Sequence, residues 1–342
     1  MSSYKYTFKK FIKDWMLIIG MLAGAGIYLI YNSLDFLHPA GPYLETAVRI
    51  IQPLLLFAML FLSFCKIEPT QMRPHKWHLW LLFFQGGWYI ALSLLILWAM
   101  HSDGNLARLI LAQRIPIEAA MLCLICPTAT ACAVVTGKLG GNMAGVVTYT
   151  IIINLLVSIL VPVFVPLIYP MGGLSFSTAI CKILAKVFPL LILPCLCAWM
   201  LRYLFPKLHS KLLQYSDLSF YIWAVSLTLA LLMSTRAIVH NEGAASVLLG
   251  IAIASLLSCL MQFLCGRLIG SLYGCRISAG QALGQKNTVF AIWMGYTFFD
   301  PIVSVAGGFY SIWHNCFNTW QLYRRRKEQE SLRTRDAIIE KD

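Results

Sequence analysis

Residues 126–136 read Cys-Pro-Thr-Ala-Thr-Ala-Cys-Ala-Val-Val-Thr and interrupt a long apolar run that begins near residue 110. Pro127 removes a backbone donor and its ring clashes with the preceding turn, so a helix cannot pass smoothly through this stretch. A second interruption, Gly284-Gln285-Lys286-Asn287, falls inside another apolar run, at about residues 278–298. Each interruption alone is more typical of a simple kink. Their matching order in the two halves of the chain favours a shared, hydrated binding site.

The composition around these interruptions is that of a membrane protein. Of the 342 residues, 59% are hydrophobic and only 12% are charged, which excludes a soluble globular enzyme, a disordered chain and a collagen-like chain. The sequence contains no recognisable serine-histidine-carboxylate set, carboxylate pair or metal cluster, so we expect neither an enzyme nor a cofactor or metal centre. The 11 cysteines lie mostly in apolar runs, and we expect no disulfide framework.

Apolar runs separated by charged, proline or glycine residues predict ten membrane-spanning helices. Five fall at about 15–31, 50–65, 77–100, 110–136 and 143–168, and five more at about 178–201, 217–239, 246–270, 278–298 and 302–322. A cut near residue 170 leaves an odd number of spans in each half, so the second half enters the membrane from the opposite face. We therefore predict an all-α polytopic membrane protein with two inverted five-helix repeats, residues 1–170 and 171–322, and broken helices 4 and 9.

The distribution of Lys and Arg predicts the orientation of these spans. With ten spans, most of the basic residues fall on the side of the N-terminus, as is typical of cytoplasmic loops. The opposite side retains Arg49, Arg108, Arg114 and Arg236. We expect a multi-pass protein of the cell (cytoplasmic) membrane with both termini in the cytoplasm and a charged, solvated tail over 323–342. The net charge of +13 thus indicates contact with the lipid bilayer and not with nucleic acid, and no oligomeric state is predicted.

Three stretches of the chain resemble the bile acid sodium symporter family. They are residues 126–136, Ala279-Gly-Gln-Ala-Leu-Gly-Gln-Lys-Asn-Thr288 and Ser311-Ile-Trp-His-Asn315, within a broader likeness from about Ile51 to Thr319. The resemblance implies ten spans in two inverted repeats whose broken fourth and ninth helices cross. It also implies two sodium ions behind the crossing, and alternating-access transport of organic anions, bile acids among them, between a panel and a core domain.

Most of the sodium ligands that the resemblance implies are absent. The family's serine-asparagine pair is replaced by Cys132-Ala133, a ligand serine falls on Val146, and only Thr150 matches a ligand threonine. On the ninth helix the shared glutamate is missing and the ligand glutamine is Lys286, while Gln85 matches a glutamine of the third helix. Because sodium needs oxygen ligands, we do not expect conventional sodium coupling.

Lys286 compensates for the missing charges. Two sodium ions and one glutamate sum to +1, as does one lysine without them. We therefore interpret Lys286 as a tethered substitute for sodium that holds the broken helices together through their carbonyl groups. Proton coupling is an alternative, because burial favours the neutral amine. Two structural alternatives are that Lys286 reaches a membrane interface or pairs with a carboxylate such as Glu118.

The polar side chains near the interruptions are the candidate site residues. We expect three of them, Lys286, Gln85 and Thr150, at the ion-coupling or tethered-cation position. The candidates that line the cavity and contact the substrate are Thr128, Thr130, Cys132, Gln281, Gln285, Asn287, Thr288, His314 and Asn315. For His314 and Asn315, a packing or capping role is equally compatible with the sequence.

These features predict a secondary transporter of a small or amphipathic organic anion. Two alternatives from other classes stay open. One is an arsenite or metalloid efflux carrier, in which Cys126 or Cys132 would supply a soft thiolate ligand. The other is a non-transporting membrane sensor that retains the transporter fold.

Overall fold

A computed structural model describes residues 19–129, 131–215, 218–240 and 245–339. These residues are helical, with no β-strand among them; one isolated antiparallel β-bridge joins Thr128 to Lys286. The helices of the first half are Ile19–Ser33, α2 (Gly41–Cys65), α3 (Lys76–Met100), α4 (Asn105–Ala112), α5 (Arg114–Ile125), α6 (Cys132–Lys138) and α7 (Met143–Ile168). The described residues also contain short 3-10 helices. In the first half these are η1 (Asp35–Ala40), before α2, and η2 (Pro69–Gln71), between α2 and α3; in the second half η3 (Pro301–Ser304) lies between α14 and α15.

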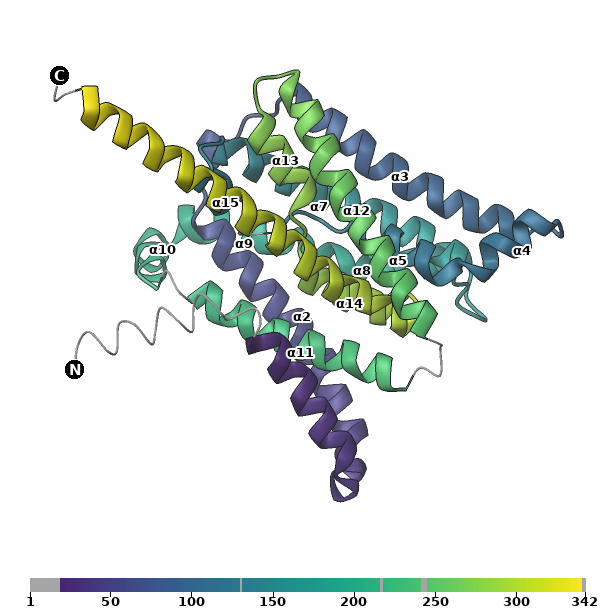
Figure 1. The fold of residues 1–342 in the computed structure, drawn as a ribbon. Helices are drawn as coiled ribbons and strands as arrows, with labels where there is room; N and C mark the ends of the chain where they lie inside the picture. The colour runs from purple at the N-terminus through teal and green to yellow at the C-terminus, as the bar shows by residue number, and fades with distance from the viewer. Residues whose placement is uncertain (1–18, 130, 216–217, 241–244, 340–342) are drawn as a thin grey trace.

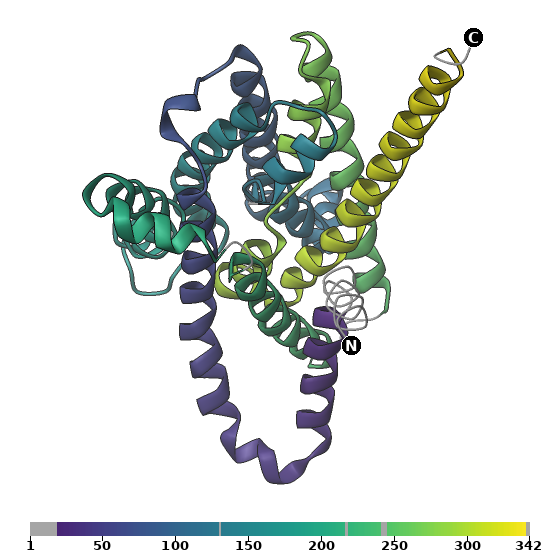
Figure 2. The ribbon, with the colours of Figure 1, turned by 90° about the vertical axis from the view of Figure 1, so that its left-hand side faces the viewer.

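The second half of the chain continues the bundle with eight helices in the described residues. They are α8 (Phe176–Leu191), α9 (Leu193–Leu204), α10 (Pro206–Leu213), α11 (Leu218–Val239), α12 (Ala245–Ser271), α13 (Arg276–Gly284), α14 (Thr288–Phe298) and α15 (Val305–Ile339). Helix α12 packs against α13, α5 and α15, while α2 packs against α11 and α9. The helix Ile19–Ser33 and α2 form a long hairpin beside the bundle (Figure 1, Figure 2).

Six helical segments among the described residues are long and apolar enough to cross a membrane. One of them, Phe176–Leu204, combines α8 and α9 across a bend at Ile192. Two shorter apolar helices, Ile19–Ser33 and Thr288–Phe298, accompany them. Helix length alone gives fewer than ten spans for three reasons. The predicted spans 110–136 and 278–298 are each divided into short helices, the first helix is short over its described residues (Ile19–Ser33), and α15 is not among the long apolar segments. The prediction of an all-helical, multi-pass membrane protein is confirmed.

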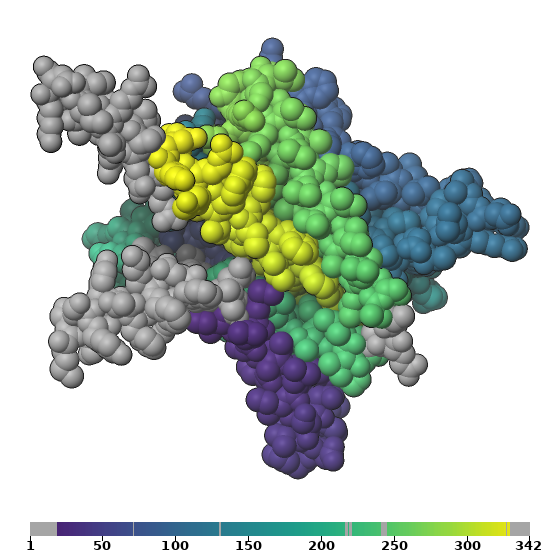
Figure 3. Space-filling view, in the orientation of Figure 1, coloured from purple at the N-terminus to yellow at the C-terminus, as the bar shows by residue number. Residues whose placement is uncertain are grey.

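The outward faces of the long helices are apolar. On α12, Leu257, Leu264 and Leu268 are each more than half exposed, and on α3 the same is true of Leu79 and Phe83. In water, such continuous apolar surfaces would favour aggregation, whereas in a bilayer they contact lipid tails. Figure 3 shows α12 and α15 side by side on one such face.

The charged C-terminal segment continues the last helix. The tail expected from residue 323 is helical over its described part, because α15 runs from Val305 to Ile339 without a break and extends beyond the other helices (Figure 1). The sequence contains no glycine or proline after Gly308, and its Arg, Lys, Glu and Gln residues are good helix formers. The absence of an apolar face therefore did not prevent helix formation.

Both predicted interruptions are present. Helix α5 ends at Ile125, immediately before Cys126-Pro127, and α6 begins only at Cys132. Helix α13 ends at Gly284 and α14 begins at Thr288. A side chain at position 284 would collide with Phe263, because a Cβ atom there would lie 2.4 Å from the ring. The glycine thus allows α12 to approach the second interruption closely.

Candidate functional site at the crossing of the interrupted helices

The two interruptions meet and pair through their backbones. The amide of Ala129 donates to the carbonyl of Gln285 at 2.9 Å, and the amide of Asn287 donates to the carbonyl of Pro127 at 2.9 Å. Together these bonds form the antiparallel bridge between Thr128 and Lys286. Backbone groups inside a membrane must be hydrogen-bonded within the protein. Each interruption therefore supplies hydrogen-bond partners for backbone groups of the other interruption that are no longer paired within a helix.

The carbonyl groups at the end of α5 are bound by a glutamine. The side-chain amide of Gln85, on α3, donates to the carbonyls of Ile125 at 3.0 Å and Cys126 at 2.9 Å. The hydroxyl of Tyr149, on α7, donates to the Gln85 Oε1 atom at 2.9 Å and fixes the orientation of the amide. A neutral donor therefore occupies the partly negative C-terminal end of this half-helix.

Neutral donors also occupy the end of α13. The Thr128 hydroxyl donates to the carbonyl of Ala282 at 2.7 Å, and the Tyr310 hydroxyl donates to that of Gly284 at 2.7 Å. Gln262, on α12, donates from Nε2 to the Tyr310 oxygen at 3.0 Å. Carbonyls at the ends of broken helices are common cation ligands in transporters. In this protein, hydroxyl groups already donate hydrogen bonds to the carbonyls of Ala282 and Gly284.

Lys286 lies at the centre of the crossing and its side chain is only 1% exposed. Its Nζ atom has no hydrogen-bond partner among the described residues. Within the described part of the chain, the titratable side chains close enough to interact with it electrostatically are four thiols and no carboxylate: Cys126, Cys123, Cys132 and Cys259. An unpaired amine in such an environment is costly, so packing alone does not explain this residue.

The expected bonds of Lys286 differ from those observed. We predicted that its amine holds the broken helices through their carbonyls, but Gln85, Thr128 and Tyr310 bind those groups and the Lys286 Nζ atom binds none. The alternative ion pair with Glu118 is also not observed. Glu118 instead pairs with Arg114 at 2.7 Å and accepts a hydrogen bond from Tyr169. Since Lys286 is buried, it does not reach an interface either.

Several other predicted residues are buried at the crossing. Asn287 caps α14, because its Oδ1 atom accepts the Phe290 amide at 3.2 Å, while its side-chain nitrogen has no partner in the described residues. The side-chain oxygen of Gln285 is likewise buried and has no partner in that part of the chain. Thr288 and Cys132 are the buried first residues of α14 and α6. Gln285 and Asn287 thus keep unused hydrogen-bonding atoms at the crossing.

The remaining predicted residues are engaged elsewhere. Thr150 and Asn315 donate to carbonyls of their own helices, those of Val146 and Ser311. Gln281 donates to the side-chain oxygen of Asn318 on α15 at 3.1 Å. His314 is buried on α15 with its ring edge against Tyr310, at 5.6 Å between centroids. Thr130 lies outside the described residues.

Three residues that reach the crossing were not among the predicted site residues. They are Tyr149, Tyr310 and Gln262, which fix or supply the neutral donors described above. Their sequence signal is weak, because each is a single polar group in an apolar helix. A buried tyrosine hydroxyl usually requires a partner, but the sequence does not indicate which one.

Comparison with known families agrees with this arrangement. Residues 53–242 match the sequence model of the Sodium Bile acid symporter family, which includes the interruption between α5 and α6. The matched residues end before α13, so Lys286 lies outside them. No individual curated protein matches the chain significantly. Because the family match covers more than half of the chain, this protein belongs to the sodium bile acid symporter family of membrane transporters.

Proposed function

We propose that this protein is a secondary transporter of a small or amphipathic organic anion, in which the amine of Lys286 takes the place of sodium. The main supporting observation is that Lys286 is fully buried at the crossing, with no acidic partner among the described residues. An ionisable residue inside a membrane bundle without a partner is by default a functional candidate. When protonated, the amine would attract an anion to the centre of the bundle.

The hydrogen bonds at the crossing support independence from sodium. The carbonyls of Ile125, Cys126, Ala282 and Gly284 are already bound by neutral donors. Thr150, the only retained member of its ligand group, is bonded within its own helix. A sodium ion would have to displace several of these bonds and would find, among the residues that the structure describes, no carboxylate near Lys286 to balance its charge.

The ten-span architecture is part of this proposal. We infer that α5 with α6 and α13 with α14 are the broken fourth and ninth spans of two inverted repeats, residues 1–170 and 171–322. Their antiparallel backbone pairing supports opposite directions in the membrane. The excess of Lys and Arg on one side supports cytoplasmic termini in a cell membrane. The broken spans would then hold the substrate site between them while the surrounding helices rearrange.

Flux into reconstituted vesicles tests the function. We suggest measuring uptake of radiolabelled cholate, decanoate and benzoate with sodium or potassium as the only alkali cation, across a pH series. Lys286→Gln is the test variant, and Lys186→Gln, which changes an exposed lysine on α8, is the matched control. We expect uptake without sodium that falls at least about tenfold in Lys286→Gln, since a lost charge-assisted contact contributes a few kcal/mol, and that is unchanged in Lys186→Gln.

The same vesicles decide between the proposal and its alternatives. If Lys286→Gln transports like the parent at every pH, the residue has only a packing role. Binding of an anion without any flux would instead support the membrane sensor. No specific contact favours the metalloid carrier. Among the described residues, no three His, Cys, Asp or Glu side chains are grouped as a metal site. Accumulation that follows an imposed pH gradient would identify the proton as the coupling ion.

A further inference from the structure

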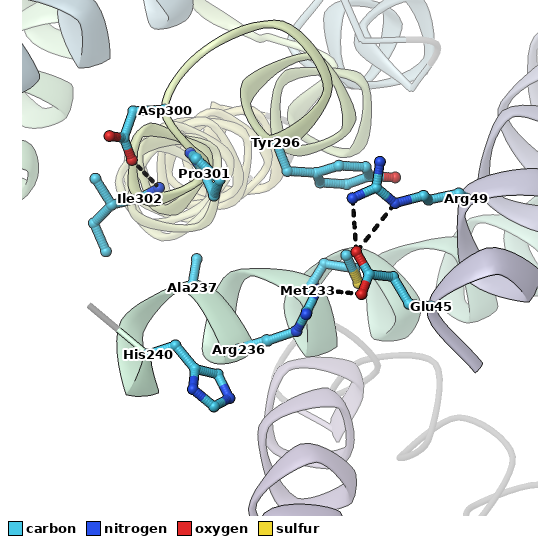
Figure 4. Close-up of a pocket in the computed structure, with 10 residues that line it drawn as sticks. All are labelled: Glu45, Arg49, Met233, Arg236, Ala237, His240, Tyr296, Asp300, Pro301 and Ile302. Atoms are coloured by element: carbon cyan, nitrogen blue, oxygen red, sulfur yellow. Dashed lines mark hydrogen bonds and ion pairs between the residues drawn. The ribbon is translucent and has the colours of Figure 1, made fainter. Parts of the chain in front are cut away.

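A cavity of about 490 Å³ lies apart from the crossing, between the α2–α11 pair and the end of α14 (Figure 4). We call it the arginine cavity. Its lining residues are Glu45, Arg49, Met233, Arg236, Ala237, His240, Tyr296, Asp300, Pro301 and Ile302. None of these residues belongs to the two interruptions, so this cavity is separate from the surroundings of Lys286.

One carboxylate bridges two guanidinium groups on the wall of this cavity. Oε1 of Glu45 accepts from Arg49 NH2 at 2.6 Å, and Oε2 accepts from Arg236 NH1 at 2.9 Å. The two arginines come from different helices, α2 and α11, and Figure 4 shows Glu45 between them. Each oxygen of a single carboxylate thus contacts one guanidinium. The two guanidinium groups are thus spaced to bind the two oxygens of one carboxylate, and the carboxylate of a ligand could bind them in the same way.

The arginines remain accessible and keep unused donors. The side chains of Arg49 and Arg236 are 59% and 41% exposed, whereas that of Glu45 is 25% exposed. A guanidinium has five N–H donors, and only some of them bind Glu45. Tyr296 adds a buried hydroxyl without a partner among the described residues, and its ring lies beside Arg49 (Figure 4).

The other titratable groups of the cavity are engaged elsewhere. Asp300 accepts the amide of Ile302 at 3.1 Å, and His240 forms a 2.6 Å hydrogen bond with the Tyr28 hydroxyl. The rest of the wall is apolar and comes from Met233, Ala237, Pro301 and Ile302. With Glu45 displaced, the two arginines and Asp300 would leave one net positive charge beside this hydrocarbon surface. This combination suits a molecule with one anionic group on an apolar body.

We propose that the arginine cavity is a binding site for an organic carboxylate, and that Glu45 is a resident carboxylate that the ligand displaces. The proposal rests on the proposed function in taking the ligand to be the transported anion. Ion pairs that are partly exposed contribute little to stability, so exchanging Glu45 for another carboxylate costs little. The bidentate geometry of guanidinium favours a planar carboxylate. The apolar body of the ligand would lie along Met233, Ala237, Pro301 and Ile302.

Binding to the purified full-length protein tests this site. The probes are cholate, decanoate and benzoate, together with the neutral methyl ester of cholate. We expect Glu45→Gln to bind the three carboxylates more tightly, because the internal competitor is removed, and Arg236→Gln to bind them more weakly. Both changes should be on the order of tenfold, as is common for a directly contacting charge at an interface. The control is Asp35→Asn, which removes an exposed acid outside the cavity and should leave binding unchanged.

The outcomes separate this site from the transport function. Equal or weaker binding of all three carboxylates in Glu45→Gln, with an unchanged melting temperature as evidence of folding, would overturn the proposed displacement. If flux is insensitive to Glu45→Gln and Arg236→Gln, the proposed site is wrong and the proposed transport function stands. If binding responds to both variants but no flux is detected, the proposed site stands and the proposed transport function is wrong. If none of the three carboxylates binds, the carboxylate assignment is wrong.

Discussion

At the crossing, the Lys286 amine is buried with no hydrogen-bond partner in the described part of the chain, whereas in the arginine cavity Glu45 is paired with two arginines that remain partly exposed. The first arrangement is costly, because a polar group in the interior has lost its water and gained no bond. The second is nearly neutral in energy, because water can replace each ion pair. We propose that the buried amine is retained for function, and that the exposed pairs open and close when a ligand binds.

The largest expected effect follows from replacing the Lys286 amine with an apolar chain of similar length. Lys286→Met should abolish most transport and yet stabilise the protein by about 1–3 kcal/mol, the typical cost of a buried unsatisfied polar group. Flux in vesicles and thermal unfolding in detergent measure the two effects. Loss of stability together with loss of transport would mean that Lys286 is a structural residue, which would remove the contrast with the arginine cavity.

The next effect concerns the neutral donors. Gln85→Leu leaves the carbonyls of Ile125 and Cys126 without a donor and should destabilise the protein by about 2–5 kcal/mol, since each buried unsatisfied group costs 1–3 kcal/mol. A matched control is Gln52→Leu, which removes a buried glutamine that bonds to Ser226 on α11. Both variants should lower the melting temperature, but only Gln85→Leu should change flux per folded molecule. An equal loss of flux in both would show that the donors at the crossing have no special role.

A smaller effect is expected at the second interruption. Gly284→Ala places a methyl group against Phe263 and should destabilise the protein by about 1–3 kcal/mol, as is typical of overpacking. Gly26→Ala is the control, because a Cβ atom at that position meets nothing within 4 Å. It should leave stability unchanged or raise it slightly, by up to about 1 kcal/mol. Thermal unfolding of both variants measures the difference, and an unperturbed Gly284→Ala would contradict the close packing of α12 on the crossing.

The smallest effect on stability is expected in the arginine cavity. Glu45→Gln removes two partly exposed ion pairs and should change stability by less than about 1 kcal/mol. The same variant should bind carboxylates more tightly, so affinity and stability respond differently at this site. A large loss of stability in thermal unfolding would indicate that Glu45 is a structural link between α2 and α11, and the contrast with Lys286 would then be wrong.

Local chemistry explains which parts of this architecture can be predicted from the sequence. Pro127 and Gly284 end helices through properties of their own backbones, so both interruptions can be predicted without knowledge of the fold. The donors that complete the crossing cannot, because Gln85 and Tyr310 bind carbonyls 26 or more residues away in the chain. Likewise the sequence indicates a significant lysine at position 286 but not the absence of bonds to its amine.

Local side-chain bonds limit what the sequence can predict about the site. Thr150 and Asn315 can satisfy their side chains within their own helices, and this local bond competes with any role at the site. Matching a residue to a ligand position does not account for that competition. The helical form of the described part of the tail likewise depends on helix propensity, which acts without an apolar face.

The central claim is that an attached amine replaces the mobile alkali cation at the crossing. It is tested most directly by titrating sodium into vesicles that contain the parent protein, with potassium keeping the ionic strength constant, while cholate, decanoate and benzoate uptake is measured. The proposed mechanism predicts an initial rate that is independent of sodium concentration and that is lost in Lys286→Gln. A rate that rises from zero and saturates with sodium would contradict it.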